Sequence, residues 1–132
     1  MLYAILCYNE ENAVASWTQE EDDACMARLM HVQSGMAGRG KLGPVVRLWN
    51  TDEAKTLRKT NGAPVVFDGP FAETKEQFLG FYVADCADMD EALAFARDLA
   101  EANPGLGCYE IRPLRFFGDN KLAGAPQIMA AE

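Results

Sequence analysis

The chain has 132 residues, of which 49% are hydrophobic and 24% are charged. This length suits one domain with a single core, and the composition is that of a folded protein. The formal net charge of −8 repels polyanions, which argues against nucleic acid and anionic membranes as partners. No run approaches the roughly 18 apolar residues of a membrane span, and no basic leader precedes an apolar segment. We therefore expect a cytoplasmic protein.

Charge is distributed unevenly along the chain. Residues 39 to 59 hold six of the twelve cations, whereas residues 10 to 23 hold six carboxylates. Such a distribution can mark a groove for a small anion or an acidic surface for a partner. Charged side chains also protect the edges of sheets from aggregation, so both interpretations stay open.

The cysteines and the single histidine argue against a metal centre. Cys7, Cys25, Cys86 and Cys108 are widely spaced and form no C-x-x-C pair, which predicts buried thiols. One histidine without a cysteine cluster does not suit zinc or an iron–sulfur cluster. Since the common nucleotide-loop and hydrolase motifs are also missing from the sequence, we expect no metal and no cofactor.

The first part of the chain predicts a strand followed by a helix. Residues 2 to 8 form a short apolar run, as expected for a central strand. Thr18-Gln19-Glu20-Glu21 matches a capping box, which predicts that a helix over residues 18 to 37 starts there. Its apolar side chains lie at steps of three and four and should face the sheet. This stripe comprises Cys25, Met26, Leu29, Val32 and Met36.

The middle of the chain predicts a strand and then a hairpin. Apolar and polar residues alternate over residues 45 to 49. Residues 55 to 60 and 63 to 67 flank Asn61-Gly62, a strong hairpin signal because both residues accept positive φ. This hairpin resembles an insertion before the loop at residues 67 to 77.

The last elements complete an α+β pattern. Residues 78 to 86 predict a core strand in which Gly80 marks a close backbone approach. A helix starts at Asp88, and a final strand covers residues 109 to 117, where Pro113 indicates an edge, a bulge or an early bend. This order predicts an α+β sandwich with two helices on one face of an antiparallel sheet. The other face needs a cover, which a homodimer would supply. Its candidate residues are Phe81, Val83, Phe116 and Phe117.

The most distinctive loop covers residues 67 to 77. Gly69-Pro70 excludes a continuous helix or central strand there, so the chain must turn. Several charged and hydroxyl side chains follow the turn. The loop is either solvated or directed at a ligand, since function concentrates on loops held by rigid elements.

This loop also carries a resemblance to a known family. The run Asp68-Gly69-Pro70-Phe71-Ala72-Glu73-Thr74-Lys75-Glu76-Gln77, followed by Gly80-Phe81-Tyr82 and an acid-rich helix, resembles the DGPF branch of the YCII-related family. The resemblance covers the domain of residues 1 to 117 and leaves residues 118 to 132 as a C-terminal tail or arm. It implies a ferredoxin-like fold that pairs into a dimeric α+β barrel. Because members are often encoded with extracytoplasmic-function sigma factors, it also implies a possible sigma-factor partner.

The candidate acid/base pair is His31 with Asp68. A carboxylate can orient an imidazole and raise its pKa when the two are in hydrogen-bond reach. Similar proteins carry a histidine on the first helix and an acid elsewhere, which implies proton transfer. At about 100° per residue, however, His31 lies about 200° from Leu29 at the centre of the apolar stripe. The helical wheel therefore favours a His31 that faces solvent or another subunit.

Six further residues are candidate ligand contacts. An arginine beside an indole can hold a carboxylate or phosphate if its strand face points inward, and is an ordinary exposed arginine otherwise. Charged loop residues can bind an ion or form weak exposed pairs, and aromatic residues can line a pocket or fill the core. The candidates are Arg47, Trp49, Glu73, Thr74, Lys75 and Tyr82.

Two functions fit these observations. The first is a small homodimer that binds a small organic molecule between sheet and helices, with proton transfer, isomerisation or elimination as the chemistry if it is catalytic. The second is a noncatalytic regulatory module that docks a sigma factor through the acidic residues at 20 to 23.

Overall fold

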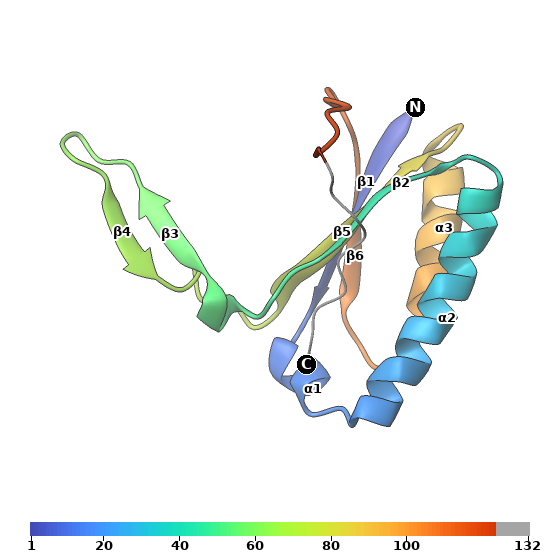
Figure 1. Ribbon diagram of the computed structural model, residues 1–132, viewed down its shortest axis with the longest axis horizontal. Coiled ribbons are helices and arrows are strands. Elements are labelled where there is room, and N and C mark those ends of the chain that lie inside the picture. Colours follow the sequence, from blue (N-terminus) through green and yellow to red (C-terminus); the bar gives the residue numbers. More distant parts are fainter. Residues whose placement is uncertain (124–132) are drawn as a thin grey trace.

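The structure, a computed structural model, describes residues 1–123 as an α+β sandwich with a projecting hairpin (Figure 1). Its elements are β1 (Leu2–Asn9), α1 (Glu11–Ala15), α2 (Gln19–Gly38), β2 (Leu42–Arg47), the 3₁₀ helix η1 (Thr51–Glu53), β3 (Lys55–Arg58), β4 (Val65–Asp68), β5 (Gln77–Asp85), α3 (Met89–Ala102) and β6 (Cys108–Pro113). Among these residues, no helix combines the length and apolarity needed to cross a membrane.

Four strands form an antiparallel sheet in the order β2-β5-β1-β6. The apolar run at residues 2 to 8 lies at its centre, as predicted, and Pro113 is the last residue of edge strand β6. Helices α2 and α3 cover one face (Figure 1), so the predicted ferredoxin-like α+β fold is confirmed. The sheet does not close into a barrel within the chain.

The core lies between this sheet and the two helices. Alternate residues of β1 and β5 point toward the helices, and Ile5 and Leu99 are fully buried there. Tyr82 packs edge-on against Phe95 with ring centroids 5.9 Å apart, a geometry that aromatic pairs prefer. The residues of β1, β2 and β5 that point the other way lie on what we call the helix-free face. Its members include Leu6, Tyr8, Val46, Phe78 and Phe81.

Helix α2 begins where the sequence predicts. The Glu21 amide donates to Thr18 Oγ1 at 3.1 Å, and the Thr18 amide donates to the Glu21 carboxylate at 3.0 Å, which completes the capping box. Two otherwise unpaired amides are satisfied in this way. The predicted stripe also faces the sheet, since Cys25, Leu29 and Met36 are buried.

The inserted hairpin is present but turns differently from the prediction. Strands β3 and β4 form a separate two-stranded sheet (Figure 1). Neither Asn61 nor Gly62 adopts positive φ. Instead the loop is longer, and the Thr60 hydroxyl closes it by accepting from the Gly62 amide at 3.0 Å and donating to the Ala63 carbonyl at 2.8 Å.

The boundaries of two predicted strands were wrong, and one short helix was missed. The final strand stops at Pro113, because its partner β1 begins at Leu2, whose carbonyl accepts a last bond from the Leu114 amide at 2.8 Å. Residues 115 to 117 therefore lie beyond the ladder. Strand β2 starts earlier and ends at Arg47, which leaves Trp49 beyond the sheet. Helix α1 was not predicted because it spans little more than one turn. Most of the predicted tail at residues 118 to 132 lies outside the described residues.

Gly80 allows β2 and β5 to approach each other closely, as the sequence predicted. A Cβ at this position would lie 2.2 Å from the Val46 carbonyl oxygen. We expect Gly80→Ala to destabilise the fold by about 2 to 3 kcal/mol, because overpacking at a backbone contact cannot relax by side-chain rotation. Denaturant unfolding followed by circular dichroism measures this.

Gly35→Ala is the matched control. Gly35 lies within α2, and a Cβ there meets nothing within 4 Å. This variant should gain roughly 0.5 to 1 kcal/mol from helix propensity. Equal stability of the two alanine variants would contradict the close approach at Gly80.

Candidate functional site

Residues 68 to 77, which we call the DGPF segment, have two structural roles. The first half of the segment closes the base of the hairpin. The Gly69 amide donates to the Ala54 carbonyl at 2.8 Å, and Thr56 Oγ1 donates to the Gly69 carbonyl at 2.8 Å. Gly69 has a φ of +94°, a conformation that suits glycine. Lys55 pairs with Asp68 at 2.5 Å, although both side chains are exposed. Asp68 and Gly69 thus fasten the two strands of the hairpin together.

The second half of the segment is held at the end of β1. Gln77 Nε2 donates to the Thr74 carbonyl at 2.6 Å, and Gln77 Oε1 accepts from the Glu11 amide at 2.9 Å. The Glu11 carboxylate in turn accepts from the Thr51 amide at 3.0 Å and from the Thr51 hydroxyl. Glu11 therefore ties the chain entering the hairpin to the chain leaving it.

A hollow of about 490 Å³ lies beside this second half, which we call the strand-end hollow. Tyr8 from β1 and Glu110 from β6 meet there, with the Tyr8 hydroxyl 3.5 Å from a carboxylate oxygen of Glu110. The Cys108 thiol lies 4.0 Å from a carboxylate oxygen of Glu76. The residues that line the hollow are Tyr8, Thr74, Glu76, Cys108, Tyr109 and Glu110.

The electrostatics of the hollow are acidic. Its described lining contains two carboxylates and no lysine or arginine. Desolvation raises the pKa of the Tyr8 phenol, and the neighbouring Glu110 carboxylate raises it further, since a negative charge disfavours the phenolate. Tyr8 is therefore a hydrogen-bond donor at neutral pH, next to a carboxylate that can accept a proton.

Aromatic rings connect the hollow to the helix-free face. Tyr8 and Phe78 have centroids 5.5 Å apart, and Phe78 stacks on Phe81 at 6.3 Å with an interplanar angle of 6°. Phe78 is exposed, and Phe81 is half-buried. One end of the helix-free face is thus apolar and leads directly to the polar groups of the hollow.

The structure does not bring His31 and Asp68 together within one chain. His31 is exposed on α2, as the helical wheel predicted. Asp68 ends β4 and pairs with Lys55. Helix α2 and the hairpin lie on opposite sides of the sheet (Figure 1). A catalytic role for either residue stays a prediction.

The other predicted ligand contacts are scattered. Arg47 points to the helix side, where it pairs with Asp22 at 3.2 Å and lies near the sulfur of Met26. Trp49 is 65% exposed. Tyr82 is buried in the core, where desolvation raises its pKa.

The predicted loop residues divide between the hollow and solvent. Thr74 lines the strand-end hollow, whereas Glu73 and Lys75 are exposed. Thr74 is therefore the one predicted contact that the structure places beside Tyr8 and Glu110.

Five residues of the hollow were not among the sequence candidates: Tyr8, Glu76, Cys108, Tyr109 and Glu110. Four of them come from β1 and β6, two strands that are distant in sequence, and the register pairs Tyr8 with Cys108. The only sequence signal for Tyr8 was the alternation of β1, which puts its side chain on the face of the sheet that does not carry the core residues. The sequence had predicted four buried thiols, and this is wrong for Cys108, which is exposed because it begins an edge strand. Burial raises the pKa of Cys7 to about 12.

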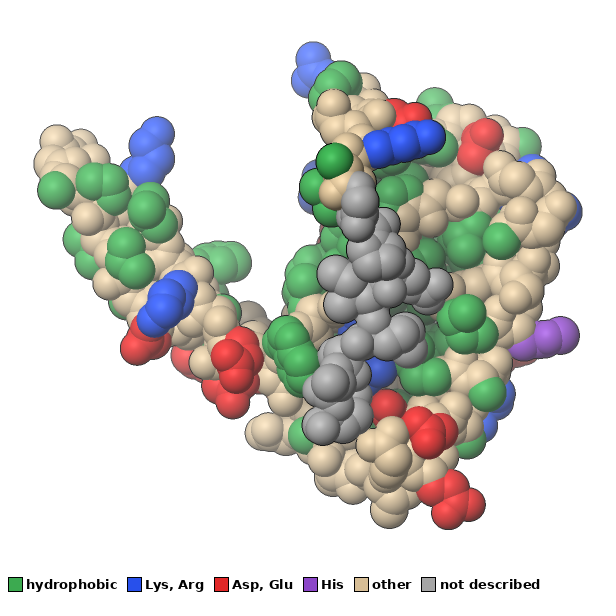
Figure 2. All heavy atoms as spheres, in the orientation of Figure 1, with side chains coloured by type: hydrophobic (Ala, Val, Ile, Leu, Met, Phe, Trp, Pro, Cys, Tyr) green, Lys and Arg blue, Asp and Glu red, His purple; other side chains and the backbone are tan. Residues whose placement is uncertain are grey.

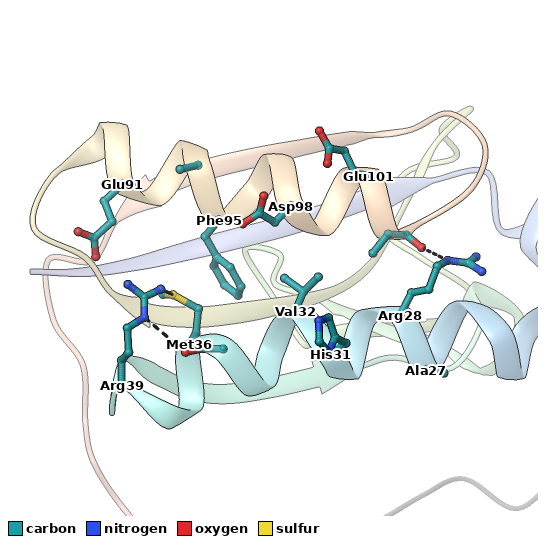
Figure 3. A pocket seen from close by; sticks show the side chains of 13 residues that line it. Ala27, Arg28, His31, Val32, Met36, Arg39, Glu91, Phe95, Asp98 and Glu101 are labelled. Carbon is teal, nitrogen blue, oxygen red and sulfur yellow. Dashed lines mark hydrogen bonds between the residues drawn. The ribbon is translucent and has the colours of Figure 1, made fainter.

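A second hollow, of about 890 Å³, separates α2 from α3 on the outer side of the helices (Figure 3). His31 lines it together with cationic residues of α2 and acidic residues of α3. Arg28 crosses it to donate to the Ala102 carbonyl at 2.7 Å, and Arg39 donates to the Gly35 carbonyl on its own helix. Each arginine therefore donates to a backbone carbonyl in the last turn of a helix, Arg28 in α3 and Arg39 in α2.

The acidic residues at 20 to 23 also have partners within the chain. Glu21 belongs to the capping box, and hydrogen bonds from Thr18 lower its pKa. Asp22 pairs with Arg47, and Asp23 accepts from Gln19 at 2.8 Å. Three of the four carboxylates thus hold the start of α2 in place.

The strand order and the two helices on one face define a ferredoxin-like α+β protein. The chain belongs to the YCII-related domain family, whose model matches residues 1–117, which confirms the family that the sequence resembles. It is 56% identical over 122 residues to an uncharacterised protein of Rhizobium meliloti (strain 1021), covering 92% of this chain and 98% of that protein.

The contact between Tyr8 and Glu110 can be tested by titration. In Glu110→Gln, the pKa of Tyr8 should fall toward the ordinary value of about 10, because the adjacent negative charge is lost while partial desolvation remains. Carbon-13 NMR of labelled tyrosine rings measures this, with Tyr8→Phe to assign the signal. Glu101→Gln on α3 is the control, and an unchanged Tyr8 pKa in Glu110→Gln would contradict the contact.

Proposed function

We propose that the protein is a cytoplasmic homodimer that binds a small organic molecule in the strand-end hollow. The observation that carries this proposal is the convergence of Tyr8, Glu110, Cys108 and Glu76 beside the DGPF segment. Ligand sites typically combine apolar walls with a few convergent polar groups, and they measure roughly 300 to 1,000 Å³. The hollow of about 490 Å³, with aromatic rings at its edge, has this character.

The lining favours a ligand with hydrogen-bond donors. Glu76 and Glu110 supply acceptor oxygens, and their charge attracts an ammonium group and repels a carboxylate. The tyrosine rings add faces on which a cation or a second ring can stack. An amine or a polyhydroxylated compound with an apolar portion fits these groups.

Proton transfer is the chemistry that the pair Tyr8 and Glu110 supports best. Glu110 as base would take a proton from carbon next to a carbonyl, while Tyr8 donates a hydrogen bond to the carbonyl oxygen as it gains charge. Return of the proton to another atom of the same molecule would be an isomerisation, and departure of a leaving group would be an elimination. This chemistry is an extension of the binding proposal.

The helix-free face supports the homodimer. Phe78 and Phe81 lie on it next to half-buried Leu6 and Val46, and one pair of helices cannot cover both faces of a sheet. Association of two such faces buries apolar surface from both copies by a two-fold operation. It would also narrow the entrance to each strand-end hollow.

Ligand preference is tested with three probes that share one ring. We expect benzylamine to bind more tightly than benzyl alcohol, and benzoate to bind least, in saturation-transfer NMR with the full chain. Glu110→Gln should weaken benzylamine binding by about tenfold, which corresponds to about 1.4 kcal/mol for a lost charged contact. Glu101→Gln on the outer helix should bind like the unmodified protein. Preference for benzoate, or equal binding by both variants, would overturn the proposed site.

The homodimer is tested by a charge on the helix-free face. The unmodified chain should sediment with twice its mass of 14.5 kDa. Phe81→Glu should sediment as a monomer, with its dissociation constant raised at least 100-fold, since an unpaired charge would be buried. Phe81→Tyr keeps the ring and should stay dimeric. Association of Phe81→Glu equal to that of Phe81→Tyr would exclude this face as the interface.

A further inference from the structure

The β3–β4 hairpin, together with its base at residues 54 to 70, projects from the domain with its apolar side chains uncovered. Leu57 and Val66 are each 61% exposed, Val65 is 51% exposed, and Phe67 is also exposed. Phe71, which follows the base, is 73% exposed. Figure 2 shows hydrophobic side chains along the hairpin and on the wall of the body across a wide gap.

The two faces of the hairpin are both apolar. In the register of β3 and β4, Leu57 pairs with Val66, and Arg58 pairs with Val65. Directly paired residues point to the same face and alternate along the strands. Leu57 and Val66 therefore share one face, while Val65 and Phe67 lie on the other. If the hairpin lay with one face against a single flat surface, its other apolar face would remain exposed to solvent.

An isolated two-stranded sheet is at best marginally stable in water. The hydrogen bonds at residues 54, 56 and 69 hold only the base of this hairpin. Beyond them, the described chain gives the hairpin the bonds of one ladder and the two Thr60 bonds at the turn, while its apolar side chains remain exposed. A contact from outside the chain would give this segment the burial that its own domain does not.

The charge of the hairpin favours a second copy of this chain. Residues 54 to 70 carry three cations, Lys55, Arg58 and Lys59, against one carboxylate, Asp68, on a chain whose net charge is −8. Lys55 already pairs with Asp68. Within residues 1–123, Arg58 and Lys59 form no ion pair, so two cations near the tip are available to an acidic surface. The rest of the same chain is such a surface.

The position of the hairpin also fits a second copy. Figure 1 shows it leaving the sheet near one end of β2 and β5 and extending on the helix-free side. The hairpin and the helix-free face thus border one open space. A partner that covers the helix-free face would occupy this space and contact the hairpin, and in a two-fold symmetric dimer each hairpin would make this contact with the other protomer.

We propose that the β3–β4 hairpin clasps the second protomer, so that its Leu57/Val66 face, its Val65/Phe67 face or both are buried against the partner. This inference rests on the proposed homodimer and adds a contact to it. The clasp would bring the partner against the base of the hairpin, which is joined through Glu11 to the rim of the strand-end hollow.

Hydrogen exchange of the hairpin amides tests the clasp directly. In the full chain at concentrations where it is dimeric, amides of β3 and β4 should exchange at least tenfold more slowly than in Phe81→Glu. Residue 81 lies in β5, outside the hairpin, so the difference reports association and not local structure. Equal exchange in a dimer and in the monomeric variant would overturn the clasp while leaving the homodimer and the ligand site intact.

Two double variants test the faces. Leu57→Glu with Val66→Glu, or Val65→Glu with Phe67→Glu, should raise the dimer dissociation constant at least tenfold in sedimentation equilibrium. The control, Ser34→Glu with Ala94→Glu, adds the same charge at exposed positions of α2 and α3 and should associate normally. At concentrations where every variant is monomeric, all should have the same thermal midpoint, because no hairpin residue belongs to the core formed by residues 1–123. If neither hairpin variant weakens association, or if the unmodified chain is monomeric at every concentration, the clasp is wrong. Benzylamine binding then tests the ligand site separately.

Discussion

Alternation of side chains along β1 and β5 is the constraint on which the rest of the structure depends. Each residue that points beneath the helices is followed by one that points to the opposite face. Ile5 and Tyr82 therefore enter the core, while their neighbours Leu6 and Phe81 reach the helix-free face. Since α2 and α3 cover only one face, Leu6 and Phe81 on the other face stay half-buried in the part of the chain that the structure describes. The aromatic path to Tyr8 depends in addition on a break in this alternation: the register shifts between Cys7 and Tyr8, so that Phe78 and not Leu79 lies opposite Tyr8.

Local signals in the sequence were enough for most of the fold. The capping box at Thr18, the close approach at Gly80 and the edge position of Pro113 each depend on a few adjacent atoms, so the residue type alone is informative. The hairpin at Asn61-Gly62 was found by the same logic, but its turn was not. There the Thr60 hydroxyl supplies bonds that replace a turn with positive φ, and such competition between side chain and backbone is hard to foresee.

The candidate site was harder to predict, because its residues come together only through the pairing register of β1 and β6. Thr74 and Glu76 stand in the DGPF segment and could be suspected from it, but Tyr8 and Glu110 meet only because β1 and β6 pair with a particular offset. A shift of one residue would turn Glu110 to the helix side and remove the contact. His31 and Asp68 were chosen for their chemistry. Their elements lie on different sides of the sheet (Figure 1), a separation that no local pattern encodes.

The DGPF segment joins the two proposed contacts mechanically. Its first residues fasten the base of the hairpin, and its last residues shape the rim of the strand-end hollow. Glu11 binds Thr51 on the chain entering the hairpin and Gln77 on the chain leaving it. A partner that fixes the hairpin and a ligand that fixes Thr74 and Glu76 would thus act on one connected set of bonds. If the two events favour the same arrangement, each must strengthen the other by the same factor, because coupling between sites is reciprocal. The segment would then link assembly of the dimer to occupancy of the hollow without itself touching the reacting atoms.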